Sequence, residues 1–446
     1  MEIKPKRKRI KALVLFALGI LSPGRPGVAQ GNERDARVTV SPTVQVSEAY
    51  AKRPHAEVIL AADPGDSRRL LAGSKIINAG MGSSVVAYAS ADGGRTWELT
   101  LEKKAEKGGR WYGNPTIAFG PDGVAYFAAM FSSGRGMEVS ASRDGGRTWD
   151  APFTAERLMD RPFLVTDCTR GRFRGRLYCS ENLGGDLGVW KSRDGARTFE
   201  PPTLLVCQGS AAQSRIFGQG VVLSDGTLVV PYQALTKASD QRWSLRVQRS
   251  ITGGESFLAE QIMRDYTADA GASPMMAGDF PSMANGHASG GFRDRLYLVW
   301  SERTADGTLV MLTQSNDKGA TWSAAVPLGD KAGVTQEDRA ITRIATMPSV
   351  AVNPAGVVAV TWYDATVRDK TILRRVRIRA STDGGVSWLP AVDVTDFVNS
   401  SDPEAGDGWL GHTAGLAADA VGAFHPLWID SRTGVRQVFT TAVVVK

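Results

Sequence analysis

The sequence predicts an all-β protein, a β-propeller built from four-stranded antiparallel blades. Its 446 residues exceed the roughly 250–300 at which a single hydrophobic core usually stops growing, so the chain needs two domains or a repeat array that divides its core. A string of eight residues recurs six times, and successive copies start 50 to 66 residues apart, within or just above the spacing that marks propellers. Short apolar runs separated by turn residues surround each copy, as expected of strands. A repeat array therefore explains the length best.

The first 29 residues have the pattern of a secretory signal peptide. A basic segment runs from Lys4 to Lys11, mostly apolar residues follow at 12–21, and the small residues Gly27 and Ala29 stand where cleavage would occur. The alternative is an uncleaved membrane anchor, but about ten apolar residues are too few to cross a bilayer, which takes ~20. We expect a secreted protein, periplasmic or extracellular, without a membrane span after cleavage, in which residues 30–446 form one propeller domain.

The charge of the chain lies mostly in this leader. Residues 1–29 hold seven Lys and Arg residues against one Glu, which is +6 of the formal charge of +7. The rest of the chain is close to neutral and has no general attraction for polyanions. We therefore expect no nucleic-acid partner.

The recurring string, which we call the octet, follows the pattern Ser-x-Asp-x-Gly-x-Thr-Trp. Its Asp carboxylate can accept N–H groups of a turn, its Gly supplies a positive φ, and its Trp buries a ring that pins the turn to the next strand. A catalytic group is needed once and not six times, so we interpret the octets as structural turns. The six octets are residues 90–97, 142–149, 192–199, 250–257, 315–322 and 381–388.

Each octet sits in a unit of four expected strands. Before the second octet, residues 114–130 contain two apolar runs split by the turn Gly-Pro-Asp-Gly, and residues 137–142 form a third run that leads into the octet. A fourth run follows each octet, and four antiparallel strands make one propeller blade. A seventh unit at 415–445 has three strands and no octet, so a strand within residues 36–46 is expected to close the ring and remove the open edge. We predict seven blades, with six as the alternative because octets number six.

The cysteines and histidines indicate no metal or cofactor. Cys168 and Cys179 flank a basic loop and are predicted to form a disulfide in an exported protein, whereas the alternative is three free buried thiols, Cys207 included. Neither these cysteines nor the four histidines have the spacing of metal ligands. We expect no metal, although a calcium ion held by loop carboxylates stays open, and no cofactor.

The octets match the Asp-box, or BNR repeat, and the run of units from residue 36 to 446 resembles the sialidase-superfamily β-propeller. The resemblance implies an exported glycoside hydrolase that acts on terminal sugars, and a glycan or glycoconjugate as partner. The motif also occurs in some glucanases and receptor ectodomains, so it does not by itself specify an activity. We expect the site on the face opposite the octets, where longer loops surround the central channel, and we expect a monomer.

Sialidase chemistry would need an arginine cluster to bind the substrate carboxylate, a tyrosine nucleophile beside a carboxylate, and a second acid. The family signature Phe/Tyr-Arg-Ile-Pro is absent near the mature N-terminus, and the nearest string is SRIFG at 214–218. Tyr363 with Asp364, or Tyr178 with Glu181, are the candidate tyrosine-carboxylate pairs. From their places at the expected rim, the catalytic candidates are Tyr363, Asp364, Glu181 and Asp160, and the substrate-binding candidates are Arg161, Arg215, Asp279, Glu302, His412 and Asp430.

Two functions follow from the sequence. One is a sialidase-like glycoside hydrolase, and the other is a non-catalytic propeller that binds glycan or protein through the same face. Convergence of two or more rim arginines in one pocket would favour the hydrolase, and their dispersal would favour the binding protein. The arginines concerned are Arg161, Arg215, Arg303 and Arg432.

Overall fold

The structure is a computed structural model, and it describes residues 37–446 with gaps. In the part that it describes, every regular element is a strand except two short 3-10 turns, η1 (Glu48–Tyr50) and η2 (Pro121–Gly123), so the predicted all-β class is confirmed. No helix among the described residues is long and apolar enough to cross a membrane. The gaps are residues 79–81, 108, 133–134, 158–159, 184–185, 206–213, 238–241, 268–279, 287–291, 306, 330–341, 369–370, 398 and 402–409.

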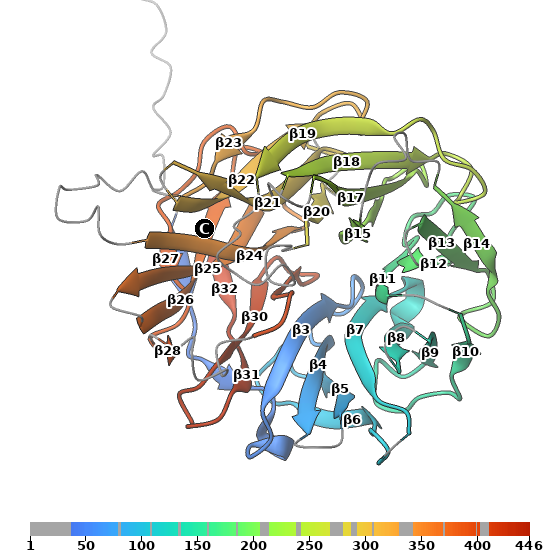
Figure 1. The fold of residues 1–446 in the computed structure, drawn as a ribbon, viewed down its shortest axis with the longest axis horizontal. Coiled ribbons are helices and arrows are strands. Elements are labelled where there is room, and N and C mark those ends of the chain that lie inside the picture. Colours follow the sequence, from blue (N-terminus) through green and yellow to red (C-terminus); the bar gives the residue numbers. More distant parts are fainter. Residues whose placement is uncertain are drawn as a thin grey trace, which may run out of the picture. The chain divides into compact units, whose positions relative to one another are not determined.

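Four-stranded antiparallel sheets surround a common centre like the blades of a propeller (Figure 1). The first sheet consists of β3 (His55–Ala62), β4 (Leu70–Asn78), β5 (Gly82–Ser90) and β6 (Glu98–Lys103). The second consists of β7 (Tyr112–Phe119), β8 (Ala125–Phe131), β9 (Gly136–Ser142) and β10 (Phe153–Ala155). The third consists of β11 (Asp160–Thr166), β12 (Leu177–Leu183), β13 (Asp186–Ser192) and β14 (Glu200–Leu204).

The remaining sheets are larger. In the fourth, β15 (Ser214–Phe217) and β16 (Val221–Val222) both pair with β17 (Leu228–Lys237), followed by β18 (Arg242–Ser250) and β19 (Gln261–Thr267). A nine-stranded sheet contains β20 (Ser282–Asn285), β21 (Leu296–Thr304), β22 (Gly307–Ser315), β23 (Val326–Pro327), β24 (Thr342–Val352), β25 (Val358–Arg368), β26 (Thr371–Ser381), β27 (Val392–Asp393) and β28 (Asn399–Ser401). The last sheet contains β29 (Gly415–Ala418), β30 (Phe424–Asp430), β31 (Gln437–Thr440), β32 (Val443–Val445), β1 (Val38–Val40) and β2 (Val44–Gln45).

The hydrogen bonding does not match our expectation of seven, or six, separate four-stranded blades. Five of the sheets contain one antiparallel meander each, but the nine-stranded sheet contains strands from two successive units. A single parallel pair, Thr308 with Ile344, joins β22 to β24 and makes those two units one sheet. A contact of this kind between neighbouring units has no signature in the repeat pattern.

Strands from both ends of the described chain share the last sheet. β2 runs antiparallel to β31, with Val44 opposite Thr440, and β1 runs antiparallel to β32, with Val38 opposite Val445. We expected one strand within residues 36–46 to pair with the last unit. The structure places two short strands there, and they pair with two different C-terminal strands.

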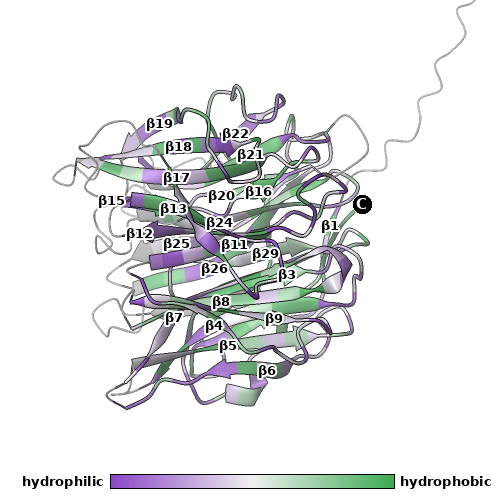
Figure 2. Ribbon diagram, turned by 90° about the vertical axis from the view of Figure 1, so that its right-hand side faces the viewer, coloured by the Kyte–Doolittle hydropathy of each residue, from purple (hydrophilic) through white to green (hydrophobic). Residues whose placement is uncertain are grey.

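The core lies between neighbouring sheets. Leu71 and Val85 of the first sheet pack in one cluster with Ile117 and Phe127 of the second. Because a sheet has neighbours on both faces, its middle strands are apolar along nearly their whole length, as in β8, whose seven residues are all buried. Figure 2 shows these hydrophobic stretches in green along the stacked strands.

The octets form the predicted turns. In the first octet, Asp92 Oδ1 accepts the N–H groups of Arg95 and Thr96, both at 3.0 Å, and Oδ2 accepts the Thr96 hydroxyl at 2.7 Å. Gly94 has a φ of 84° and donates its N–H to Ser90 Oγ at 2.9 Å. The fourth octet has Thr252 in place of Asp, and the Thr252 hydroxyl oxygen accepts the N–H of Ser256 at 3.0 Å. These bonds confirm that the octets hold the turns.

The predicted Cys168–Cys179 disulfide is wrong, because both thiols are free. Cys179 lies opposite Leu164 in the β11–β12 ladder. Leu164 precedes Cys168 by four residues, and four residues of extended chain span about 13 Å. A disulfide needs Cα atoms within roughly 7 Å of one another. The third cysteine, Cys207, lies outside the described residues.

Candidate functional site

Four inner strands, β3, β7, β11 and β24, carry a β-bulge. At each bulge a residue other than glycine adopts a positive φ, at a cost of roughly 1–3 kcal/mol, and bulges commonly re-aim side chains beside functional sites. These residues are Glu57 (φ 52°), Asn114 (φ 49°), Arg161 (φ 58°) and Met347 (φ 51°).

The bulges lie at the end of the sheets opposite the octets. In the first sheet, Ala62 pairs with Leu70, and Leu70 pairs with Ser90, where the octet begins. Glu57 lies near the other end of the same strand β3. The bulges are therefore on the face where we expected the functional site.

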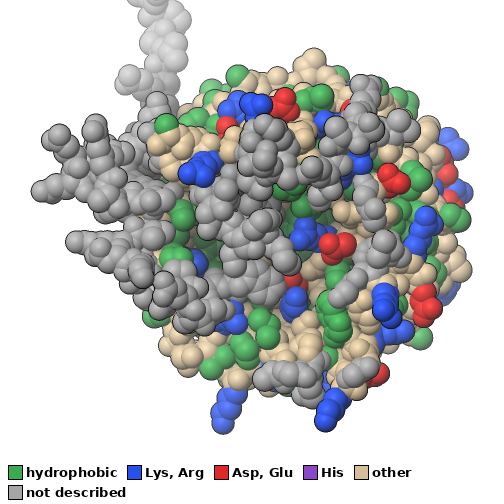
Figure 3. All heavy atoms as spheres, in the orientation of Figure 1, with side chains coloured by type: hydrophobic (Ala, Val, Ile, Leu, Met, Phe, Trp, Pro, Cys, Tyr) green, Lys and Arg blue, Asp and Glu red, His purple; other side chains and the backbone are tan. Residues whose placement is uncertain are grey.

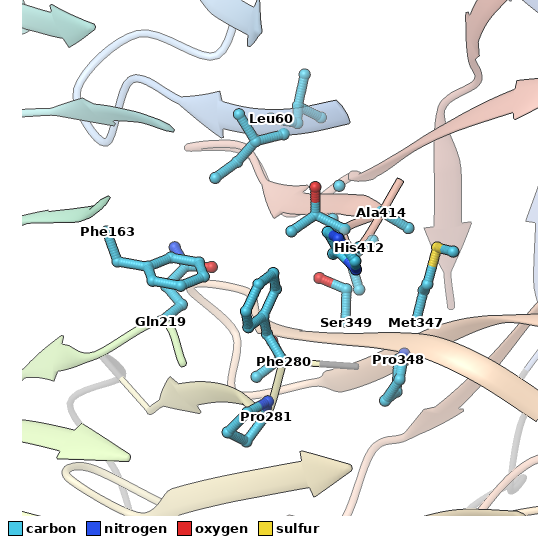
Figure 4. Close-up of a pocket in the computed structure, with 15 residues that line it drawn as sticks. Leu60, Phe163, Gln219, Phe280, Pro281, Met347, Pro348, Ser349, His412 and Ala414 are labelled. Carbon is cyan, nitrogen blue, oxygen red and sulfur yellow. The ribbon is translucent and has the colours of Figure 1, made fainter. Parts of the chain in front are cut away.

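The side chains at the bulges line two adjoining cavities. Glu57, Asn114 and Arg161 line the smaller one, Met347 lines the larger one, and both are open to solvent. Phe280 and His412 line both, and Figure 4 shows the Phe280 ring between Phe163 and His412.

Asn114 connects Glu57, which lines the smaller cavity, to Asp160, which stands directly before the lining residue Arg161. Glu57 is buried, and its Oε1 lies 3.3 Å from Lys75 Nζ, while its Oε2 accepts the Asn114 N–H at 2.9 Å. The side-chain Nδ2 of Asn114 donates to Asp160 Oδ1 at 3.1 Å. Each carboxylate therefore receives a hydrogen bond from a different part of the same residue.

The two carboxylates differ in exposure. The Asp160 side chain is 47% exposed, and its Oδ2 lies 3.6 Å from Arg161 Nε. Loss of hydration raises the pKa of Asp160, the charge of Arg161 acts against this rise, and the charge of Glu57 adds to it. An accessible carboxyl group with a raised pKa can hold a proton and give it to a ligand, as a general acid does.

The Phe280 ring lies between the Arg161 guanidinium and the rings of Phe163 and His412. It packs edge-to-face against Phe163, with 5.3 Å between ring centroids, and against His412, with 5.8 Å. The Arg161 guanidinium lies 5.3 Å from the Phe280 centroid. Burial lowers the pKa of His412 to about 3, helped by the charges of Arg161 and Lys75, so the imidazole is neutral at physiological pH. In Figure 3, basic and acidic side chains lie next to one another near the middle of the face shown.

The structure brings together three of the residues singled out from the sequence: Asp160, Arg161 and His412. Of the four rim arginines, Arg161 is the one found among the described lining residues of the two cavities. Arg432 is instead bound to Asp430 in the last sheet, with Nε 3.0 Å from Asp430 Oδ2. Asp279 lies outside the described residues.

The structure does not place Tyr363 and Asp364 as a catalytic pair. Tyr363 is buried between β25 and β30, its hydroxyl oxygen accepts the N–H of Ile429 at 2.8 Å, and burial raises its pKa. Asp364 follows it on the strand and so points to the other face, where its Oδ2 lies 3.4 Å from an Arg377 nitrogen. The same alternation separates Tyr178 from Glu181, three residues apart on β12.

The other rim candidates take part in packing between sheets. Glu181 is fully buried and is not among the described lining residues of the cavities. Glu302 accepts two hydrogen bonds from the Arg264 guanidinium of the neighbouring sheet, at 2.6 and 2.5 Å. The backbone oxygen of Arg215 accepts the Asn182 amide at 2.7 Å, which connects the third and fourth sheets.

Sequence reasoning missed Glu57, Lys75 and Asn114. Asn114 had a signal, because a residue followed by proline recurs within or just before inner strands, whereas Glu57 and Lys75 are not followed by proline. Proline ends regular strand pairing, so its recurrence beside an apolar run indicates a bulge. The four dipeptides are Asn114-Pro115, Arg161-Pro162, Phe280-Pro281 and Met347-Pro348.

Comparisons with known proteins support the fold. No protein-family model matches the chain, and no curated protein matches it. A solved protein of unknown function from Dyadobacter fermentans covers 92% of this chain and 99% of its own, with 12% identity and a TM-score of 0.51. A Hadza microbial sialidase covers 83% of this chain and 75% of its own, with 16% identity and a TM-score of 0.48. An α-L-arabinofuranosidase mutant from Fusarium graminearum covers 91% and 98%, with 12% identity and a TM-score of 0.49. The likeness to the Dyadobacter fermentans protein shows a shared fold, and none of these likenesses carries an activity over to this chain.

Proposed function

We propose that the protein is a glycoside hydrolase that acts on a terminal sugar bound at the smaller cavity. The observation that carries the proposal is the pair of carboxylates joined through Asn114: Glu57, which lines the cavity, and Asp160, which stands beside the lining residue Arg161. Most glycoside hydrolases use two carboxyl groups that flank the scissile bond, one as acid and one as nucleophile or base.

The surroundings of the two groups assign their roles. Asp160 is half-exposed and has a pKa raised by loss of hydration, so we assign it as the general acid that protonates the leaving oxygen. Glu57 is buried and accepts from Lys75 and the Asn114 N–H, so it is the second carboxylate, which faces the positive charge that develops on the sugar ring. Arg161 and His412 are placed to bind sugar hydroxyls, and the Phe280 ring offers an apolar wall.

Sialidase-like activity, which the resemblance to the sialidase superfamily suggests, is one form of this proposal. It requires a cation that binds the carboxylate of the sugar, and Arg161 is the candidate at the cavity. The proposal also includes export after removal of the leader, and a glycan or glycoconjugate as the natural partner.

The second candidate function is a propeller that binds glycan without hydrolysing it. The specific observation in its favour is the dispersal of the rim arginines: Arg161 lines the smaller cavity, whereas Arg432 is bound to Asp430 in the last sheet. A binding protein needs the cavity and its polar groups, but no acid with a raised pKa.

The test is hydrolysis of a panel of fluorogenic glycosides, sialosides and arabinofuranosides included, by the chain from residue 30 to 446. Asp160→Asn and Glu57→Gln should each reduce kcat by at least about 100-fold, the usual range for lost acid or base catalysis. The matched control is Asp364→Asn, a rim carboxylate bound to Arg377 away from the cavities, which should leave kcat unchanged. No turnover of any glycoside by folded protein would reject the hydrolase and favour the second candidate.

A further inference from the structure

One residue at the candidate site stands out for the number of roles it combines. Asn114 sits on the bulge of β7 with a φ of 49°, and it is directly followed by a proline. Asn adopts this left-handed region more readily than most residues, whereas Glu57, Arg161 and Met347 reach it at the other bulges despite longer side chains. The bulge is therefore easiest to form at Asn114.

The hydrogen bonds of Asn114 show what the bulge does. The backbone N–H at the bulge leaves the β7–β8 ladder, whose regular pairing is interrupted between Gly113 and Thr116, and donates to Glu57 Oε2. The side-chain amide turns the other way, donating to Asp160 Oδ1 at 3.1 Å and lying 3.4 Å from the Met130 sulfur. Acceptors on β3, β8 and β11 thus surround one residue, with Glu57 bound to its backbone N–H and the other two to its side-chain amide.

Each bond reaches a different carboxylate, and the two carboxylates come from different sheets. The spacing between such groups decides the course of glycoside hydrolysis, roughly 5–5.5 Å for retention of configuration and 6.5–9.5 Å for inversion. A residue bonded to both groups controls that spacing more directly than either carboxylate's own strand.

We propose that Asn114 is the positioning residue of the carboxylate pair, with its backbone orienting Glu57 and its side chain orienting Asp160. This inference rests on the proposed function for its catalytic meaning, but its structural content does not require turnover. Asn114 transfers no proton, because an amide has no titratable group at physiological pH.

The experiment measures the protonation of Asp160 directly. The chain from residue 30 to 446 is labelled with ¹³C at the aspartate carboxyl carbons, and the Asp160 signal is identified by its loss in Asp160→Asn. Asn114→Gly keeps the positive φ and the N–H to Glu57, but removes the amide that favours the ionised form of Asp160. The titration midpoint of Asp160 should rise by about one pH unit in this variant.

The matched control is Met347→Gly, which makes the same substitution at the equivalent bulge of β24, away from both carboxylates. It should leave the midpoint of Asp160 unchanged. Equal midpoints in wild type and Asn114→Gly, or equal shifts in Asn114→Gly and Met347→Gly, would overturn the proposal. If Asn114→Gly does not fold, Asn114→Ala gives the same test, since it also removes the amide and should raise the midpoint of Asp160.

This experiment fails separately from the hydrolase proposal. Absence of turnover on every glycoside would reject the hydrolase and leave the titration result standing. If a glycoside is hydrolysed, the alkaline limb of kcat/KM should move up in Asn114→Gly by the shift that the titration shows. Met347→Gly should change KM without moving that limb.

Discussion

Replacing Glu181 with glutamine should change the free energy of unfolding more favourably at pH 7 than at pH 4. Glu181 is fully buried in β12, and neither of its carboxylate oxygens has a hydrogen bond of good geometry from the described residues. At the corresponding strand ends in other sheets, Glu302 is bound by Arg264, and Asp430 by Arg432. Glu181 is therefore a buried acid in a position that elsewhere has an arginine partner.

The magnitude follows from the protonation of this group. Burial raises the pKa of Glu181 from 4.5 to about 8, and the nearby Trp190 indole and Arg157 charge offset only part of the rise. Well below pH 4.5 the Glu181 carboxyl is protonated in both the folded and the unfolded chain, so its titration does not lower the free energy of unfolding. Between pH 4.5 and 8 the unfolded chain gains by ionising while the folded chain stays protonated, so folding stability falls as pH rises. At 1.36 kcal/mol per pH unit, the loss is about 3 kcal/mol at pH 7 and about 5 kcal/mol above pH 8.

Urea denaturation of wild type and Glu181→Gln between pH 4 and 8 measures this effect. The buried amide of glutamine needs hydrogen-bond partners at every pH, so the informative quantity is the change in the stability difference between pH 4 and pH 7, expected at about 3 kcal/mol in favour of the variant. The control Glu302→Gln weakens a paired carboxylate and should destabilise by about 1–3 kcal/mol at pH 7. A change below about 1 kcal/mol, or one of opposite sign, would refute the reasoning that Glu181 is neutral in the folded protein.

Three further outcomes are expected. Tyr363→Phe removes the hydroxyl bonded to the Ile429 backbone, so the free energy of unfolding should fall by about 1–2 kcal/mol while glycoside turnover stays unchanged; a large loss of kcat in a stable variant would contradict its structural placement. Asp144→Ala leaves the N–H groups of the second octet turn without their acceptor and should lower the Tm in thermal unfolding, whereas an equal Tm would show that the turn does not need its carboxylate. When unfolded, unreduced protein is alkylated, mass spectrometry should find both Cys168 and Cys179 modified. Two unmodified cysteines would instead support the disulfide predicted from the sequence.

The octets were predictable because their hydrogen bonds close within eight residues. The Asp92 carboxylate binds N–H groups three and four residues ahead, so the string contains every partner that the turn needs. The arrangement of the sheets depends on distant pairs instead. The parallel pair Thr308 with Ile344 merges two units, and neither residue carries a local signal of it.

The residues of the candidate site that stand at strand ends could be predicted from the sequence, and those within strands could not. Asp160, Arg161 and His412 were found because topology alone brings the starts of inner strands to one face. Glu57 was missed because regular alternation of a strand's side chains cannot indicate a bulge, which turns an interior residue toward the centre. Glu302 was wrongly expected to bind substrate, because its ion-pair partner, Arg264, comes from another sheet and could not be predicted from the local sequence.

The distribution of backbone strain supports a functional origin for the bulges. Nine described residues other than glycine have a positive φ. Ala196 and Lys318 lie in octets, and Asp122 lies in a tight turn, so local hydrogen bonding accounts for them. Arg161 and Met347 lie inside inner strands, where a regular ladder would cost less and where long side chains suffer most from the left-handed conformation. Packing between sheets does not require this strain, since β17 and β18 pack in the core with no positive φ among their described residues. The four residues at the bulges all line one of the two central cavities, and this shared place supports the proposal that the functional site lies there.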